Sequence, residues 1–156
     1  MDDHVVAEDM DTIVDRIMRS HWAVFHLHFV DFMAAHLSDC CAVFDGDLHE
    51  MLVFTIVAQR YLRDRVAEGD SQTSTGSERR SLSASRIAAQ TGMPRETVRR
   101  KLAALQARGW VERTDRAEWR MAVSNGRAAV ALTLADFTRR EMRRVIKLGR
   151  ALKPLV

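Results

Sequence analysis

The chain has 156 residues, of which 47% are hydrophobic and 29% are charged, a composition typical of a globular protein with its own core. Its longest apolar run, over residues 51–58, is far shorter than the ~20 residues that a membrane span needs. The acidic start, Met1-Asp2-Asp3-His4, is unlike the basic start of a signal peptide, so we expect a cytoplasmic protein that makes no membrane contact.

Charge is divided unequally between the two halves of the chain. Residues 1–70 contain five Lys and Arg against fourteen Asp and Glu, a net charge of −9, whereas residues 71–156 contain nineteen against seven, a net charge of +12. This asymmetry indicates that the second half faces a polyanion, and nucleic acid is the commonest one because neutralised phosphates release counterions. A solvated basic face is the alternative that composition alone leaves open.

The first half predicts two long helices. Apolar residues spaced by three, four and seven predict a helix over residues 9–36, which Ser20 could divide in two. Asp45-Gly46-Asp47 predicts a turn, and Asp47 with Glu50 has the spacing of a capping box that opens a helix over residues 48–66. Since the second helix is apolar on nearly every side, we expect it to be central and buried.

A polar segment and a set of short elements follow. Residues 68–80 (EGDSQTSTGSERR) contain no large apolar side chain and predict a flexible connector. Beyond it we expect a helix from Ser83 to Gly92, a second helix from Pro94 to Gly109, and two strands over 110–113 and 119–123 joined by a turn. After a turn at Ser124-Asn125-Gly126, a last helix is predicted from about Thr133, in a capping-box spacing with Asp136, to Leu148, with Gly149 as its stop.

The spacing of small and apolar residues over 83–113 is typical of a helix-turn-helix. Ala88 is small enough for a second helix to approach closely, and Gly92, four residues later, can adopt the positive φ of a tight turn. Val98 should then pack onto Ile87, and Leu102 and Leu105 should continue the buried stripe. An ordinary helical hairpin is the alternative.

If Val98 faces the core, the opposite side of the second helix points outward at its N-terminal end, where major-groove readers lie. Arg pairs with guanine O6 and N7, and Glu accepts from cytosine N4. The predicted base contacts are therefore Arg95, Glu96 and Arg100. The alternative is that Glu96 only stabilises the helix start and that the arginines are solvated.

Phosphate contacts require hydroxyls and cations near helix starts and in the wing, which is the hairpin formed by the two predicted strands over 110–113 and 119–123. Between Arg79 and Arg127 there are twelve basic residues against four acidic ones. In the wing, Trp119, Met121 and Val123 should cover the helices while Arg120 points outward. The predicted phosphate and wing contacts are Ser83, Ser85, Arg86, Thr97, Arg99, Lys101 and Arg116.

Two families of regulators resemble parts of this sequence. The segment 94–100 (PRETVRR) is similar to the recognition helix of Crp/Fnr-type regulators, whose R-E-x-x-x-R pattern falls here on Arg95, Glu96 and Arg100. The order of elements along the chain resembles the MarR type, which implies a homodimer built by the first and last helices, with two wings straddling an operator. The wing segment 113–120 (RTDRAEWR) is shorter than that family's wing motif.

Other residues suggest chemistry only weakly. The histidines lack zinc-type spacing, so core or interface roles are favoured over a metal site, and no metal or cofactor is expected. The adjacent Cys40 and Cys41 indicate a reducing compartment, with redox sensing as an alternative. No phosphate loop or nucleophile elbow occurs, so we expect no enzyme. A ligand pocket, as an alternative to plain core, would lie at Trp22, Phe25 and Phe29.

Together these patterns predict a mainly α protein with a winged helix-turn-helix, a short two-stranded β-wing, and dimerisation helices at both ends. The predicted parts are a dimerisation and sensing region (1–68), a connector (69–80), the DNA-binding domain (81–124) and a C-terminal dimerisation helix (125–156). We expect a homodimeric regulator that binds double-stranded DNA, and the sequence leaves open whether it also senses a small-molecule effector. A protein-docking winged helix and a replication or partition factor are the alternatives.

Overall fold

The fold was analysed in a computed structural model that describes residues 9–67 and 81–156. It is mainly helical with two small antiparallel sheets of two strands each, which confirms the predicted fold class. The described residues form two compact units, one from the parts up to Asp39 and from Asp136 onward, the other from Cys40 to Ala135. The predicted connector, 69–80, lies outside the described residues.

The first unit begins with helix α1 (Met10–Arg16), a π-helical turn η1 (Ile17–His21) and helix α2 (Trp22–Val43). Ser20 lies inside the π-helical turn, and Trp22, with φ −51° and ψ −50°, keeps a helical conformation. The predicted break is therefore a change of helix type and not a loop. The predicted end at His36 is wrong, because α2 continues through both cysteines.

Helix α6 (Ala135–Leu152) completes the first unit and is followed by a 3₁₀ turn, η4 (Lys153–Leu155). The prediction that Gly149 stops this helix is wrong. Gly149 has an ordinary helical conformation with no positive φ, so nothing at this position interrupts the helix. The helix ends two residues before Pro154, where proline disfavours the α conformation of the residue preceding it.

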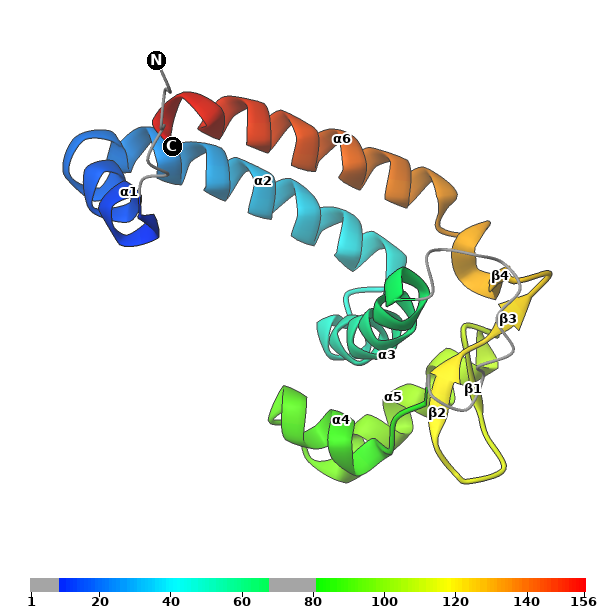
Figure 1. Ribbon diagram of the computed structural model, residues 1–156. Coiled ribbons are helices and arrows are strands. Elements are labelled where there is room, and N and C mark those ends of the chain that lie inside the picture. Colours follow the sequence, from blue (N-terminus) through cyan, green and yellow to red (C-terminus); the bar gives the residue numbers. More distant parts are fainter. Residues whose placement is uncertain (1–8, 68–80) are drawn as a thin grey trace, which may run out of the picture. The chain divides into compact units, whose positions relative to one another are not determined.

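Ion pairs join α2 to α6, which run side by side (Figure 1). Asp39 accepts hydrogen bonds from Arg140 Nε at 2.7 Å and from Arg144 at 2.8 Å, and His36 Nδ1 lies 2.5 Å from Glu141 Oε2. The hydrogen bonds from Arg144 and Arg140 lower the pKa of Asp39, and the bond to Asp39 raises the pKa of Arg144. These contacts show that the side of α2 with His36 and Asp39 faces α6.

The second unit contains the end of α2 and all of the short elements. The first sheet pairs Val111 with Met121, and a bridge from Leu82 to Trp119 adds a third segment at its edge. Asn125 and Gly126, both with positive φ, turn a second hairpin that the sequence predicted only as a turn. The elements are α3 (Leu48–Ala67), α4 (Ala84–Thr91), α5 (Arg95–Ala107), β1 (Val111–Arg113), β2 (Trp119–Met121), β3 (Val123–Ser124), β4 (Arg127–Ala128) and η3 (Ala129–Ala131).

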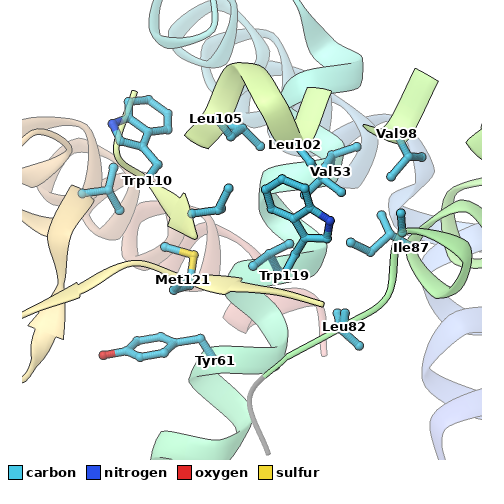
Figure 2. Close-up of a cluster of buried hydrophobic side chains, with 14 of the residues drawn as sticks. Val53, Tyr61, Leu82, Ile87, Val98, Leu102, Leu105, Trp110, Trp119 and Met121 are labelled. Carbon is cyan, nitrogen blue, oxygen red and sulfur yellow. The ribbon is translucent and has the colours of Figure 1, made fainter. Parts of the chain in front are cut away.

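Helix α3 is central to this unit, but it is buried on one face only. Val53 and Val57 are completely buried, whereas Leu62 is 57% exposed and Val66 is 78% exposed. The expectation that α3 is buried all round is therefore wrong for its C-terminal half. The inner face packs on α4, α5 and β2 and forms the core of the unit, drawn in Figure 2, with Val53, Tyr61, Leu82, Ile87, Val98, Leu102, Leu105, Trp110, Trp119 and Met121.

Candidate nucleic-acid interface

The turn between α4 and α5 has the geometry that the sequence predicted. Ser83 caps α4, its hydroxyl oxygen accepting from the Arg86 N–H at 3.2 Å. At the other end Gly92 has φ +71°, in the left-handed region that favours glycine, and its N–H donates to the Ala88 carbonyl at 2.9 Å. A capped start and a left-handed end thus limit α4 to two turns and redirect the chain into α5.

The buried side of α5 is the apolar stripe that the spacing predicted. Val98, Leu102 and Leu105 are each completely buried, and so is Ile87 on α4. Figure 2 shows Ile87 of α4 close to Val98 of α5, with Leu102 and Leu105 farther along α5. This packing fixes the rotation of α5 about its own axis, and hence which residues point outward.

The outward side of α5 carries the three predicted base contacts. Arg95, Glu96 and Arg100 are all exposed, and none of them belongs to the buried core. Glu96 Oε2 lies 3.5 Å from Arg99, in an ion pair whose side chains are 82% and 63% exposed. Because such exposed pairs contribute only about 0–1 kcal/mol, this pair does little to hold either side chain away from a ligand.

The predicted phosphate contacts flank this side, with one exception. Ser85, Arg86, Arg99 and Arg116 are exposed, and Ser83 and Thr97 are half-buried. Ser83 uses its oxygen as a cap acceptor and keeps a hydroxyl proton to donate.

Lys101 is the exception, because its ammonium forms an ion pair with Asp47 and its side chain is only 15% exposed. Burial alone would raise the pKa of Asp47, but hydrogen bonds from Lys101 and from the Glu50 N–H outweigh it and lower that pKa. This intramolecular ion pair competes with a phosphate contact.

Residues 76–115 match the family model of the IclR helix-turn-helix domain. The matched segment contains α4, the turn, α5 and β1. It supports a DNA-binding helix-turn-helix of a transcriptional regulator, of IclR type and not specifically of the MarR type that the order of elements suggested. Neither the search of curated proteins nor the search of solved structures found a match.

The wing is the β1–β2 hairpin with its turn at Thr114–Glu118. Ala117 has φ +58° in this turn, and the Glu118 N–H donates to the Thr114 hydroxyl at 3.2 Å. Trp119 and Met121 face the core as predicted, but Val123 is 46% exposed because it belongs to the second hairpin. Arg120 lies 2.6 Å from Glu112 across the sheet, and Arg116 is at the exposed tip.

A buried contact between α3 and α5 was missed by the sequence reasoning. Glu50, expected to complete a capping box, is only 4% exposed and instead lies 3.3 Å from Arg108 Nε, just after α5. Asp47 does accept from the Glu50 N–H at 2.9 Å, so half of the box is present. Burial raises the pKa of Glu50, and the charge of Arg108 opposes that rise.

Arg108 makes further contacts with the turn before α3. It donates to the Val43 carbonyl at 3.1 Å and to Asp45 at 3.0 Å, and its guanidinium lies 5.2 Å from the Trp110 ring centre. With the pair of Lys101 and Asp47, these contacts hold both the middle and the end of α5 on α3. The acidic Asp45–Asp47 turn was the signal available in the sequence.

The three residues of the predicted ligand pocket lie on α2. Trp22 is 51% exposed, Phe29 is 42% exposed, and Phe25 stacks on Phe29 with ring centres 6.4 Å apart. A hollow of about 220 Å³ between α2 and α6 is lined by other residues: His28, Asp31, Phe32, Ala35, Arg144, Lys147, Leu148 and Ala151.

Cys40 is buried and Cys41 half-buried, and neither forms a disulfide bond within the described residues. Over residues 9–67 and 81–156, no three His, Cys, Asp or Glu side chains gather in a group that could hold a metal ion. No helix in the same two ranges is long and apolar enough to cross a membrane.

Proposed function

We propose that this protein is a sequence-specific regulator of transcription that binds double-stranded DNA as a homodimer. Helix α5 enters the major groove, Arg95 and Arg100 pair with guanines, and Glu96 accepts from a cytosine. The observation that carries the proposal is that α5 has one buried apolar side and one exposed basic side. Its buried stripe fixes its orientation, and the opposite side presents exposed arginines within the segment that matches a DNA-binding family.

Phosphate contacts in this proposal come from Ser83, Ser85, Arg86, Thr97 and Arg99, and from Arg116 on the wing beside the groove. Lys101 is left out, since its ion pair with Asp47 holds it on the turn before α3. It acts instead as a positioning residue for α5. The homodimer, the MarR-like roles of the terminal helices and an effector site at Trp22, Phe25 and Phe29 stay predictions.

The proposal is tested by selecting bound fragments from genomic DNA and titrating the best one by fluorescence anisotropy at several salt concentrations. Binding should weaken steeply with salt, with a log-log slope of roughly one per phosphate contact. If no fragment is enriched and weak binding does not respond to salt, the DNA-binding function is wrong and the winged helix is a protein-docking module. Enrichment of a replication or partition site without any change in transcription would instead overturn the regulatory role.

A further inference from the structure

Helix α2 carries an uncharged stripe on the side opposite α6. Its members follow one another at intervals of four and three residues, the spacing of positions that face a partner helix in a coiled coil. At 3.6 residues per turn they point away from His36 and Asp39, the residues that bind α6. The stripe, called here the α2 seam, consists of Ala23, Leu27, Val30, Ala34 and Leu37.

The α2 seam is exposed although it is apolar. Leu27 is 59% exposed, Val30 57% and Leu37 36%, and both alanines are exposed. Val24 and Phe29, on other sides of α2, are also 47% and 42% exposed. Exposed apolar patches are typical of interaction surfaces, including those that bind another protein. The two alanines would allow a partner helix to approach closely.

A second observation, the charge of the seam, favours another copy of this chain as the partner. A twofold dimer uses the same patch on both subunits, so the patch must be compatible with itself. The α2 seam contains no charged residue, and of the two carboxylates on α2, Asp39 is bonded to α6 on the opposite side. Asp31, the other carboxylate, is exposed and lines the hollow between α2 and α6.

Helix α6 offers a contrasting stripe. Met142, Val145 and Ile146 are 61%, 56% and 52% exposed, so this stripe is as open as the seam. It is flanked by Arg139, Arg143 and Arg150, which are exposed. Pairing this stripe with itself would place arginines against arginines, which costs free energy in a desolvated interface.

We infer that two copies of the protein pair through the α2 seam, and not through the outward stripe of α6. This inference rests on the homodimer of the proposed function and narrows it, because the resemblance to the MarR type implied that the first and last helices build the interface together. The pairing buries Leu27, Val30 and Leu37 against the same helix of the second subunit.

The test compares two substitutions at positions of nearly equal exposure, Val30→Asp and Ile146→Asp, with circular dichroism as the check on folding. Sedimentation velocity measures the dimer Kd of each full-length variant and of the wild type. Val30→Asp should raise the Kd by about a hundredfold, as expected for a central interface residue, and Ile146→Asp by less than about threefold. The reverse order would overturn the α2 seam and leave the homodimer standing, whereas a monomeric wild type would overturn both.

A cross-linking experiment keeps the inference falsifiable if Val30→Asp does not fold. In a Cys40→Ala, Cys41→Ser background, Val30→Cys and Ile146→Cys are treated with a short bismaleimide and resolved on a denaturing gel. Because Val30 lies near the middle of the seam, either direction of helix pairing brings the two Val30→Cys thiols within reach. A covalent dimer for Val30→Cys alone is the expected result, and a covalent dimer for Ile146→Cys alone would contradict the inference.

Discussion

Glu50 Oε1, buried at the start of α3, lies 3.3 Å from Arg108 Nε, just after the end of α5. A carboxylate that is 4% exposed is costly unless a cation accompanies it. Arg108 supplies that cation and also binds the turn before α3. The pair therefore links the position of α5 to the ionisation of one buried group.

Arg108→Ala should destabilise the protein at neutral pH. Removing the cation leaves Glu50 buried without its charge partner, at a cost of about 2 kcal/mol once the partial exposure of Arg108 is considered. Burial raises the pKa of Glu50 in the folded protein above its ordinary value of 4.5. The folded state therefore favours the protonated carboxyl. This contribution to stability is fully present below pH 4.5 and is lost as the pH rises through the raised pKa. The deficit of the variant should thus shrink as the pH falls toward 4.

Urea unfolding of the wild type and the variant at pH 7 and pH 4 measures this deficit. The double variant Arg108→Ala, Glu50→Gln is the matched control, and it should recover part of the lost stability at pH 7. A deficit of equal size at both pH values would show that lost packing on Trp110, and not the buried charge, is responsible.

Gly92→Ala and Gly149→Ala should have opposite effects on stability. At Gly92, φ is +71° and a Cβ meets open space, so the substitution adds only backbone strain, about 1–2 kcal/mol. At Gly149 the backbone is helical and nothing lies within 4 Å, so alanine should stabilise by roughly 0.5–1 kcal/mol. Thermal unfolding of the two variants beside the wild type measures both signs, and a destabilising Gly149→Ala would place a close contact at that position.

These two glycines also show what the sequence could and could not predict. Ser83, Gly92 and Gly109 end or begin elements through local backbone chemistry, so the helix-turn-helix could be read from their spacing. Gly149 looks similar as a residue, but whether a glycine ends a helix depends on its φ, which the sequence does not show. The second hairpin was missed because strands of two residues carry no periodicity.

The candidate interface, too, could be predicted from the sequence only in part. The exposed side of α5 followed from the burial of Val98, since helical geometry relates the two. The pairing of Lys101 with Asp47 and of Arg108 with Glu50 joins residues more than fifty positions apart, which spacing rules along one helix cannot relate. The sequence therefore places Lys101 among the phosphate contacts, although it binds Asp47 in the turn before α3.

Asp39→Asn should loosen the contact between α2 and α6 in a pH-dependent way. Hydrogen bonds from Arg144 and Arg140 lower the pKa of Asp39 in the folded protein below its ordinary value of 3.8. The stability that these bonds contribute is therefore present above pH 3.8 and is lost as the pH falls through the lowered pKa. The Tm of the variant should lie below that of the wild type at pH 7, and the two should converge near pH 2. Asp31→Asn, on the same helix, is the control and should match the wild type at both.

Arg99→Ala should weaken DNA binding without changing sequence preference. Arg99 is assigned to a phosphate, so its removal should reduce the slope of log K against log salt by about one unit. Anisotropy titrations on the selected site and on a scrambled site measure the slope. Arg63→Ala, an exposed arginine on α3, is the control and should bind like the wild type. A loss confined to the selected site would assign Arg99 to a base.

The account depends above all on the outward side of α5 reading bases, and a base-substitution profile of Arg100→Ala tests this most directly. The affinities of wild type and variant are measured for the selected site and for every single-base change within it. We expect the variant to lose about 1–3 kcal/mol on the selected site and to become indifferent to the base at one position in each half-site. A variant that discriminates among the substituted sites as sharply as the wild type would contradict the assignment of α5 as the reading helix.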